Sequence, residues 1–158
     1  MAGLAGAGKG IEKMSTIRVK KLRENAIIPT YGSAEAAGAD VYACLEAPVI
    51  IAAGETVFVP TGISLEVPKG HAGLIYARSS LGTKRGLAPA NKEGVIDSDY
   101  RGEVMVALHN HGKVEQTIMP GDRIAQLLIT PVLQPAFEEV EELSDTDRGQ
   151  GGFGSTGR

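Results

Sequence analysis

The sequence of 158 residues has no tryptophan, a single cysteine and few aromatic residues, 4% in all. One cysteine, Cys44, excludes an intramolecular disulfide framework and a zinc site built from several thiolates, so a reducing compartment is allowed. A membrane span needs about 18 consecutive apolar residues, and no run in the sequence approaches this length. Residues 1–13 lack the apolar core of a secretory signal. Charge of one sign is not in excess, because 16 Lys and Arg face 19 Asp and Glu, a net charge of −3. This balance excludes a strongly basic nucleic-acid coat but allows an anionic ligand held by a few local cations.

The residues that are present have the composition of one globular domain, with 42% hydrophobic and 22% charged residues. Glycine is abundant, at 21 of 158 residues, about twice its usual share of roughly 7%. We therefore expect many tight turns between short elements.

Alternation of apolar and polar residues dominates from residue 16 onward. Apolar side chains recur at every second position over 63–67 and again over 104–108, which is the period of a strand. Further β-rich runs cover 49–51, 56–60, 71–77, 114–118 and 124–130. Glycine-containing turn signals separate these runs, so the sequence predicts an all-β sandwich or barrel. At most one short helix is expected, at 79–83, with a serine as its N-cap.

The two ends differ from the middle. We expect residues 1–14 to form a flexible leader, 15–143 a β domain, and 144–158 a flexible glycine-rich C-terminal tail. The stretch 148–158 reads RGQGGFGSTGR and cannot bury enough apolar area to order itself. Composition alone favours a disordered tail. The alternative is a lid, in which Phe153 stacks on a planar ring while Arg148 and nearby hydroxyls meet phosphate oxygens.

Three loop segments carry groups suited to chemistry, although each has a plain structural explanation as well. Residues 77–82 (ARSSLG) put a cation beside two hydroxyls, which suits an anion. Residues 94–102 (GVIDSDYRG) hold two carboxylates, a tyrosine and an arginine, or form no more than an acidic β-turn. Residues 121–126 (GDRIAQ) could be a turn with an Asp–Arg pair that enters a strand.

Together with 37–42 (AGADVY) and the glycine-rich tail, these segments resemble, in order, the five motifs of the trimeric deoxyuridine triphosphatases, the dUTPases. The resemblance covers about residues 16–157. It implies a jelly-roll subunit and a homotrimer whose active sites are shared between subunits. It also implies hydrolysis of dUTP to dUMP and pyrophosphate with Mg²⁺, which limits dUTP and supplies dUMP for thymidylate synthesis. It implies no nucleic-acid or membrane partner and a cytoplasmic location, or an organelle or nucleus in a eukaryote or virus.

The same resemblance assigns roles to individual residues. Asp97 is expected to orient and deprotonate the attacking water, and Tyr100 to pack against the deoxyribose and exclude a 2′-hydroxyl. The expected uracil contacts are Asn91, Gly94, Val95, Ile96 and Met105. The expected phosphate contacts are Arg78, Ser79, Ser80 and Gln126, and the tail contacts are Arg148, Phe153, Gly154, Ser155 and Thr156. No direct protein ligand to the metal is expected, and Asp40 is the candidate that acts on Mg²⁺ through water.

Two alternatives remain open at this point. A dCTP deaminase-like enzyme would share the fold and a similar Arg-Ser-Ser segment, but it is expected to lack the Phe-Gly-Ser-Thr tail. A dUTP-binding regulatory trimer would bind the nucleotide and turn it over slowly. His71, His109 and His111 have no place in the motifs, Cys44 is expected to be a packing residue, and Asp122 and Arg123 are interpreted as structural.

Overall fold

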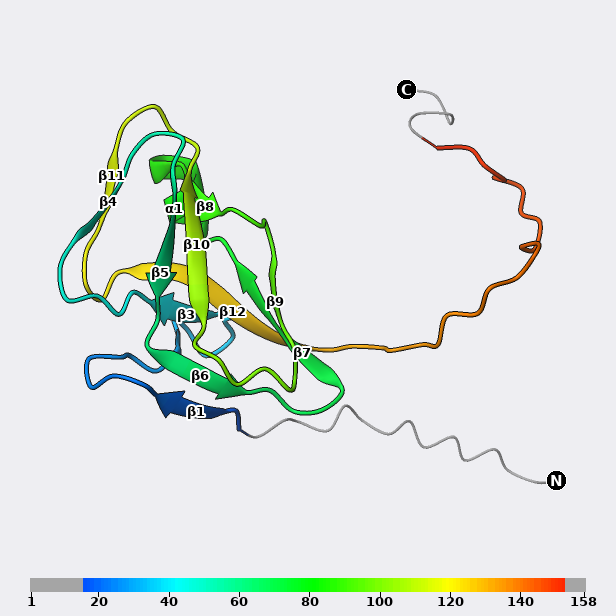
Figure 1. The fold of residues 1–158 in the computed structure, drawn as a ribbon, viewed down its shortest axis with the longest axis horizontal. Helices are drawn as coiled ribbons and strands as arrows, with labels where there is room; N and C mark the ends of the chain where they lie inside the picture. The colour runs from blue at the N-terminus through cyan, green and yellow to red at the C-terminus, as the bar shows by residue number, and fades with distance from the viewer. Residues whose placement is uncertain (1–15, 153–158) are drawn as a thin grey trace.

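The structure, a computed structural model, describes residues 16–152 (Figure 1). Its elements are short strands and one short helix, and all eight strand pairs of the described residues are antiparallel. The strands are β1 (Arg18–Lys21), β2 (Thr30–Tyr31), β3 (Ala39–Tyr42), β4 (Val49–Ile51), β5 (Thr56–Pro60), β6 (Ile63–Glu66), β7 (His71–Tyr76), β8 (Leu87–Pro89), β9 (Gly94–Ile96), β10 (Met105–Asn110), β11 (Gln116–Ile118) and β12 (Arg123–Pro131), and the helix is α1 (Ser79–Arg85). The predicted all-β fold with one short helix is confirmed.

Four sheets share one hydrophobic core. The largest sheet has the order β2-β3-β12-β7-β9, a second has the order β5-β10-β8, and β1-β6 and β11-β4 form two-stranded pairs. Each sheet sends side chains into the same cluster, for example Leu65, Leu108, Ile118 and Ile124. A fully buried aliphatic side chain contributes about 1.5–3 kcal/mol of transfer free energy, so this core holds the four sheets together.

The predicted alternation agrees with the observed burial. Val104, Val106 and Leu108 are buried, whereas Met105 between them is exposed. Strands β4 and β5 have the bounds that the sequence predicted. The strands β1, β2, β3, β8 and β9 had no predicted counterpart, because two to four residues give too short a pattern to read.

The helix differs from its prediction in two respects. It continues to Arg85, where Gly86 ends it in the left-handed conformation (φ 65°). The predicted serine cap is wrong, because Arg78 is the N-cap residue and makes no side-chain capping hydrogen bond. Ser79 and Ser80 instead lie within the helix and are exposed.

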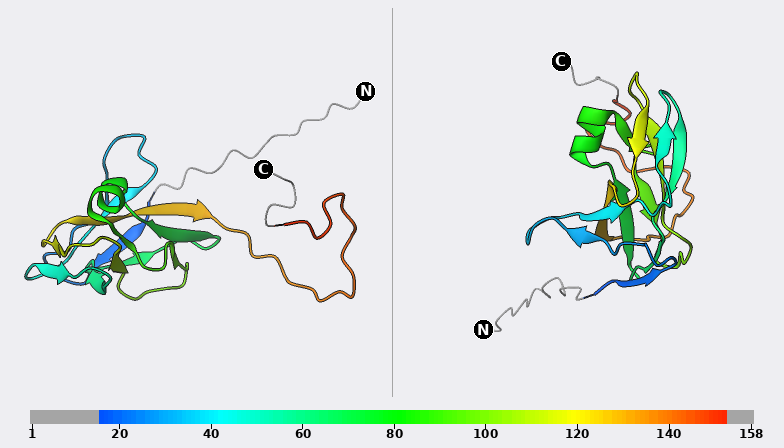
Figure 2. Two further views of the ribbon diagram at one scale, coloured as in Figure 1. Left: turned by 90° about the horizontal axis from the view of Figure 1, so that it is seen from above. Right: turned by 90° about the vertical axis from the view of Figure 1, so that its left-hand side faces the viewer.

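After β12 the chain leaves the body of the molecule, as Figures 1 and 2 show. Residues 131–150 are all exposed, and this stretch begins well before the tail boundary expected at 144. Leu133, Phe137 and Leu143 are 94%, 100% and 87% exposed. In the part of the chain that the structure describes, no helix has the length and hydropathy to cross a membrane.

Candidate active site

Five of the predicted site residues lie on strands of the five-stranded sheet. Asp40 lies on β3 and Gln126 on β12, where the two residues are register partners. Gln126 is also the partner of Tyr76 at the end of β7, immediately before the 77–82 segment. Strand β9 lies at the edge of the same sheet, paired with β7 through Gly73–Ile96, Leu74–Val95 and Ile75–Gly94.

All seven residues predicted to meet the base, the sugar and the attacking water line a single cavity of about 270 Å³. This volume is close to the lower end of the roughly 300–1,000 Å³ that is usual for small-molecule sites. The cavity lies between the edge strand β9, the loop that follows it and the start of β10. Its predicted residues are Asn91, Gly94, Val95, Ile96, Asp97, Tyr100 and Met105.

The edge position of β9 makes its backbone available to a ligand. Only one side of this strand is paired in the sheet, so the N–H and C=O groups on its other side have no strand partner. The turn that leads into it has Lys92 at φ 65°, the one positive φ of a non-glycine residue among residues 16–152. A backbone held in this sparsely populated region is typical of functional turns.

Asp97 and Tyr100 are held together by a short, braced loop. The Tyr100 N–H donates to the Asp97 carbonyl oxygen at 3.1 Å. The Arg101 guanidinium folds back and donates to the Ser98 carbonyl oxygen at 2.8 Å and to that of Tyr100 at 3.1 Å. Ser64 on β6 then donates its hydroxyl to the Arg101 carbonyl oxygen at 2.7 Å. The loop is therefore fixed, while the Asp97 carboxylate itself stays exposed.

A second group, which we call the cationic cluster, consists of Asp40, Arg78, Arg123 and Gln126. The Arg78 Nε donates to Asp40 Oδ1 at 2.8 Å, and the Arg123 Nη1 donates to Asp40 Oδ2 at 3.4 Å. Gln126 Nε2 donates to the Ala77 carbonyl oxygen at 2.8 Å. One carboxylate thus orients two guanidinium groups, and the cluster keeps a surplus of positive charge that suits phosphate oxygens.

The charges of the 270 Å³ cavity are of the opposite sign. Asp97 and Glu103 are the charged residues that line it, and none of its described lining residues is Lys or Arg. The cavity can hold a neutral base and sugar. A triphosphate would need cations that this cavity does not supply.

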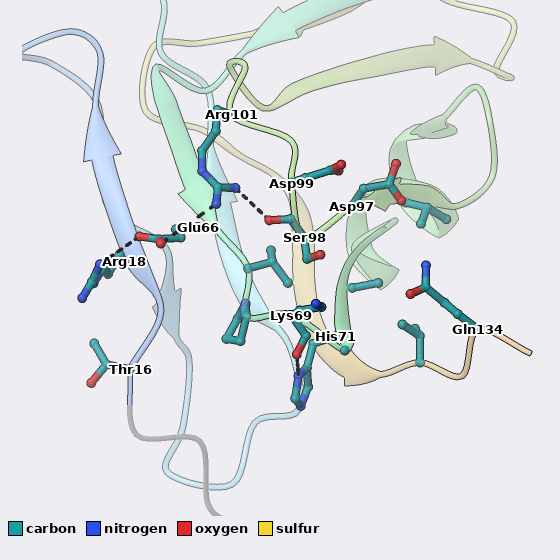
Figure 3. A pocket seen from close by; sticks show the side chains of 16 residues that line it. Thr16, Arg18, Glu66, Lys69, His71, Asp97, Ser98, Asp99, Arg101 and Gln134 are labelled. Atoms are coloured by element: carbon teal, nitrogen blue, oxygen red, sulfur yellow. Dashed lines mark hydrogen bonds and ion pairs between the residues drawn. The ribbon is translucent and has the colours of Figure 1, made fainter.

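A larger hollow of about 1050 Å³ (Figure 3) shares Val95 and Asp97 with this cavity. Its cations Arg18, Lys69 and Arg101 are matched by the anions Glu66, Asp97 and Asp99. Figure 3 shows Glu66 between Arg18 and Arg101, with N–O distances of 3.3 and 4.0 Å. The hollow therefore has no surplus of positive charge to offer a triphosphate.

Among residues 16–152, no three His, Cys, Asp or Glu side chains come together as a metal-binding group. Asp40, the residue expected to act on Mg²⁺ through water, has both carboxylate oxygens hydrogen-bonded to arginines. Two arginines beside this carboxylate do not by themselves favour a cation. Mg²⁺ readily takes phosphate oxygens and water as its direct ligands, and a bound nucleotide would supply them.

A family model for dUTPase matches residues 24–157. The chain belongs to the dUTPase family. The deoxyuridine 5′-triphosphate nucleotidohydrolase of Syntrophotalea carbinolica is 48% identical over 145 residues, which cover 92% of this chain and 99% of the relative. That of a Janthinobacterium strain is 48% identical over 148 residues, with the same coverage of each protein.

Solved dUTPase structures share the fold. A variant of the dUTPase of Staphylococcus bacteriophage 80alpha, solved with dUpNHpp, has a TM-score of 0.83 and 27% identity, and the match covers 90% of this chain and 99% of that one. A variant dUTPase of phage phi11 of S. aureus has a TM-score of 0.73 and 26% identity over 81% of this chain and 98% of that one. The phi11 structure is described as revealing the coordination of a structural Mg(II) ion. The jelly-roll architecture of dUTPases is thus the architecture of this chain.

Within the dUTPase fold, the tail residues are only partly described. Arg148 folds back on its own turn, with its Nε donating to the Gly151 carbonyl oxygen at 2.8 Å. Phe153, Gly154, Ser155 and Thr156 lie outside the described residues. The roles expected of these five residues stay predictions.

Sequence reasoning missed two features of this dUTPase. Phe58 lines the cavity and is 69% exposed. The alternation of β5 could have found it, because Val57 and Val59 are its more buried neighbours and Phe58 must point the other way. Arg123, interpreted as structural, belongs to the cationic cluster, and no signal in the sequence joins it to Asp40. Its neighbour Asp122, also interpreted as structural, accepts a hydrogen bond from the Met119 N–H at 2.9 Å within its turn.

His109, His111 and Cys44 lie outside the base cavity and the cationic cluster. Desolvation, followed by the positive charges of His109 and Lys92, lowers the pKa of His111 below its ordinary value of 6.5. The rings of His109 and His111 meet edge to face, with centroids 4.4 Å apart. Cys44 is buried and free, and its thiol donates to Asn25 Oδ1 at 3.1 Å.

Proposed function

We propose that this chain hydrolyses dUTP to dUMP and pyrophosphate through attack of water on the α-phosphorus. The observation that carries the proposal is the single cavity lined by the seven residues assigned to base, sugar and water. The nucleotidohydrolase names of its relatives at 48% identity support the same substrate. Incubation with dUTP, dCTP and UTP, followed by chromatography, tests it: dUMP from dUTP is expected, and deaminated product from dCTP would favour the deaminase alternative.

Asp97 is the proposed catalytic residue. Its exposed carboxylate, held by the braced loop, accepts a hydrogen bond from a water molecule and takes its proton as the oxygen attacks the α-phosphorus. The bond from that phosphorus to the bridging oxygen breaks, and its electron pair leaves with pyrophosphate. A carboxylate is a weak base at neutral pH, so orientation of the water accounts for much of its effect.

The backbone groups on the unpaired side of β9 are proposed to recognise uracil. Backbone groups of residues 94–97 and the Asn91 side chain offer donors and acceptors fixed in direction. Cytosine has a donor where uracil has an acceptor, and a mismatched buried group costs about 1–3 kcal/mol. A thymine methyl group would collide with β9 and the turn before it.

The cationic cluster is the proposed triphosphate site. Arg78 and Gln126, with the exposed hydroxyls of Ser79 and Ser80, would contact phosphate oxygens, and Arg123 adds charge. Bound Mg²⁺ would neutralise charge on the leaving pyrophosphate. Asp40 fixes both guanidinium groups and remains the candidate that contacts a water of the ion.

We further propose a homotrimer with shared active sites. The base cavity is anionic, and neither it nor the larger hollow includes Arg78 or Gln126, so a neighbouring subunit is the proposed source of the phosphate contacts. The segment after β12 supports this arrangement, because the exposed apolar side chains of Phe137 and Leu143 are suited to pack on another chain. In this proposal 15–143 is the subunit domain and 144–158 the tail that completes a site. The single free, buried Cys44 is compatible with the reducing cytoplasm.

Mixing two inactive variants tests the shared sites. An Asp97→Asn subunit keeps an intact tail, and a subunit truncated before Arg148 keeps an intact Asp97. Mixed trimers should regain part of the activity, because some of their sites combine both intact parts. The measurement is dUTP hydrolysis after subunit exchange verified by mass spectrometry. Exchange without recovery would assign each site to a single chain.

Substitution of Tyr100 tests sugar selection. Tyr100→Ala should raise the UTP/dUTP ratio of kcat/KM while total activity falls, because the ring no longer fills the space of a 2′-hydroxyl. Selection by packing against one hydroxyl is limited to about 10²-fold, which bounds the expected rise. Steady-state kinetics with both nucleotides measures the ratio, and an unchanged ratio would assign sugar selection to other residues.

A further inference from the structure

The ring of Tyr100 lies folded over its own loop, against Gly102. Its hydroxyl donates to the Glu103 carbonyl oxygen at 2.9 Å. A Cβ built on Gly102 would lie 2.5 Å from Cζ and 2.9 Å from Cε2 of the ring, far inside van der Waals contact. The ring occupies the space that any side chain at position 102 would need.

The backbone conformation of Gly102 does not itself require glycine. The glycines with positive φ among residues 16–152 are at positions 54, 62, 70, 86, 121 and 149. Gly102 is not one of them, so an alanine there meets no backbone strain. The contact with Tyr100 is therefore the feature of the structure that excludes a side chain.

The acceptor of the tyrosine hydroxyl is itself fixed. The Glu103 carboxylate accepts the Gly62 N–H at 2.8 Å, and its other oxygen pairs with Arg23 Nη2 at 3.2 Å. On the next residue, the Val104 carbonyl oxygen accepts the buried Thr61 hydroxyl at 2.6 Å. The end of the loop is thus tied to the turn between β5 and β6, and the hydrogen bond of Tyr100 points to a stationary oxygen.

Because Tyr100 is exposed, its contacts with Gly102 and with the Glu103 carbonyl oxygen matter for the position of its ring. The side chain is 45% exposed at the mouth of the base cavity, so little other packing holds it in one rotamer. We propose that Gly102 is a positioning residue for sugar selection. Its missing side chain allows the ring to lie flat on the loop, and the Glu103 carbonyl oxygen fixes the ring there. This inference rests on the proposed role of Tyr100 against the deoxyribose.

The Gly102→Ala variant tests the inference. The new methyl group should push the ring out of its position and raise the UTP/dUTP ratio of kcat/KM about 10-fold, within the limit for a packing effect. The Gly32→Ala variant is the matched control, because Gly32 has no positive φ and nothing within 4 Å of a built Cβ. It should leave the ratio unchanged.

A double-mutant cycle separates positioning from a general effect on the fold. In the Tyr100→Ala background there is no ring to displace, so adding Gly102→Ala should leave the ratio of that variant unchanged. An equal rise in both backgrounds would overturn the inference, because the glycine would then act without the ring. If Tyr100→Ala raises the ratio and Gly102→Ala does not, the positioning claim is wrong while the role of Tyr100 stands. An unchanged ratio in Tyr100→Ala would refute that role and, with it, this inference.

Two further measurements do not depend on the recovery of active Gly102→Ala protein. Tyr100→Phe keeps the ring and Gly102 but loses the hydrogen bond to Glu103, and it should raise the ratio about 2- to 10-fold, the size of one neutral hydrogen bond. In NMR spectra of protein labelled at its four tyrosines, the Tyr100 ring signals should shift in Gly102→Ala and not in Gly32→Ala. Unshifted ring signals, or Tyr100→Phe with the parent ratio, would each count against the inference.

Discussion

Asp97→Asn should lower kcat for dUTP about 10²- to 10⁴-fold, the usual contribution of a positioned general base, while nucleotide binding is kept. The amide has the shape of the carboxylate and can still orient water, but it cannot take its proton. Removing a negative charge beside a triphosphate also reduces repulsion of the substrate. We therefore expect the dissociation constant of a non-hydrolysable dUTP analogue to stay the same or fall.

The matched control for this prediction is Asp99→Asn. Asp99 lies two residues further along the same loop and lines the larger hollow, not the base cavity. Its substitution removes the same charge and should change kcat little. Equal losses in the two variants would show that the charge of the loop matters and that Asp97 has no special role.

Deleting 148–158 should slow hydrolysis strongly and leave the fold intact. The described part of this segment is exposed or half-buried, and its side-chain hydrogen bond is internal, from Arg148 to Gly151. Its loss removes little apolar packing. In the lid hypothesis it closes over bound nucleotide, excludes water and fixes the α-phosphorus, so kcat should fall by more than any single tail substitution.

Phe153→Ala gives the scale for that comparison. Loss of one base–aromatic stack costs roughly 1–3 kcal/mol, or about 5- to 150-fold in rate. The measurements are kcat, analogue affinity and protection of the tail from protease with and without nucleotide. Deletion of residues 1–13, a segment of similar length at the other end, is the control and should leave kcat unchanged. A near-normal kcat after tail deletion would refute the lid hypothesis and show that this segment has no role in catalysis.

The sequence predicted the parts of this molecule that depend on local pattern. Alternation over 104–108 places Val104, Val106 and Leu108 in the core because side chains of a strand point to opposite faces. The resemblance correctly grouped Asn91, Asp97 and Tyr100, which line one cavity because they follow one another along the turn before β9, the strand itself and the loop after it. These contacts are short in sequence, and a motif can encode them.

Contacts between distant strands could not be predicted in this way. Arg123 and Asp40 are separated by 83 positions and meet because β3 and β12 are neighbours in the sheet. The contact of Gly102 with the Tyr100 ring is close in sequence, but it depends on a rotamer that no pattern of residue types specifies. The serine cap failed for a related reason: the helix begins one residue earlier than a capping serine requires, with Arg78 in the extended conformation.

Hydrolysis of dUTP in water enriched in ¹⁸O tests the central claim most directly. Attack of water on the α-phosphorus, with departure of pyrophosphate, requires one ¹⁸O in the phosphate of dUMP and none in pyrophosphate. Mass spectrometry of both products after a single turnover measures this distribution. Label in pyrophosphate, or dUDP and inorganic phosphate as products, would contradict the account.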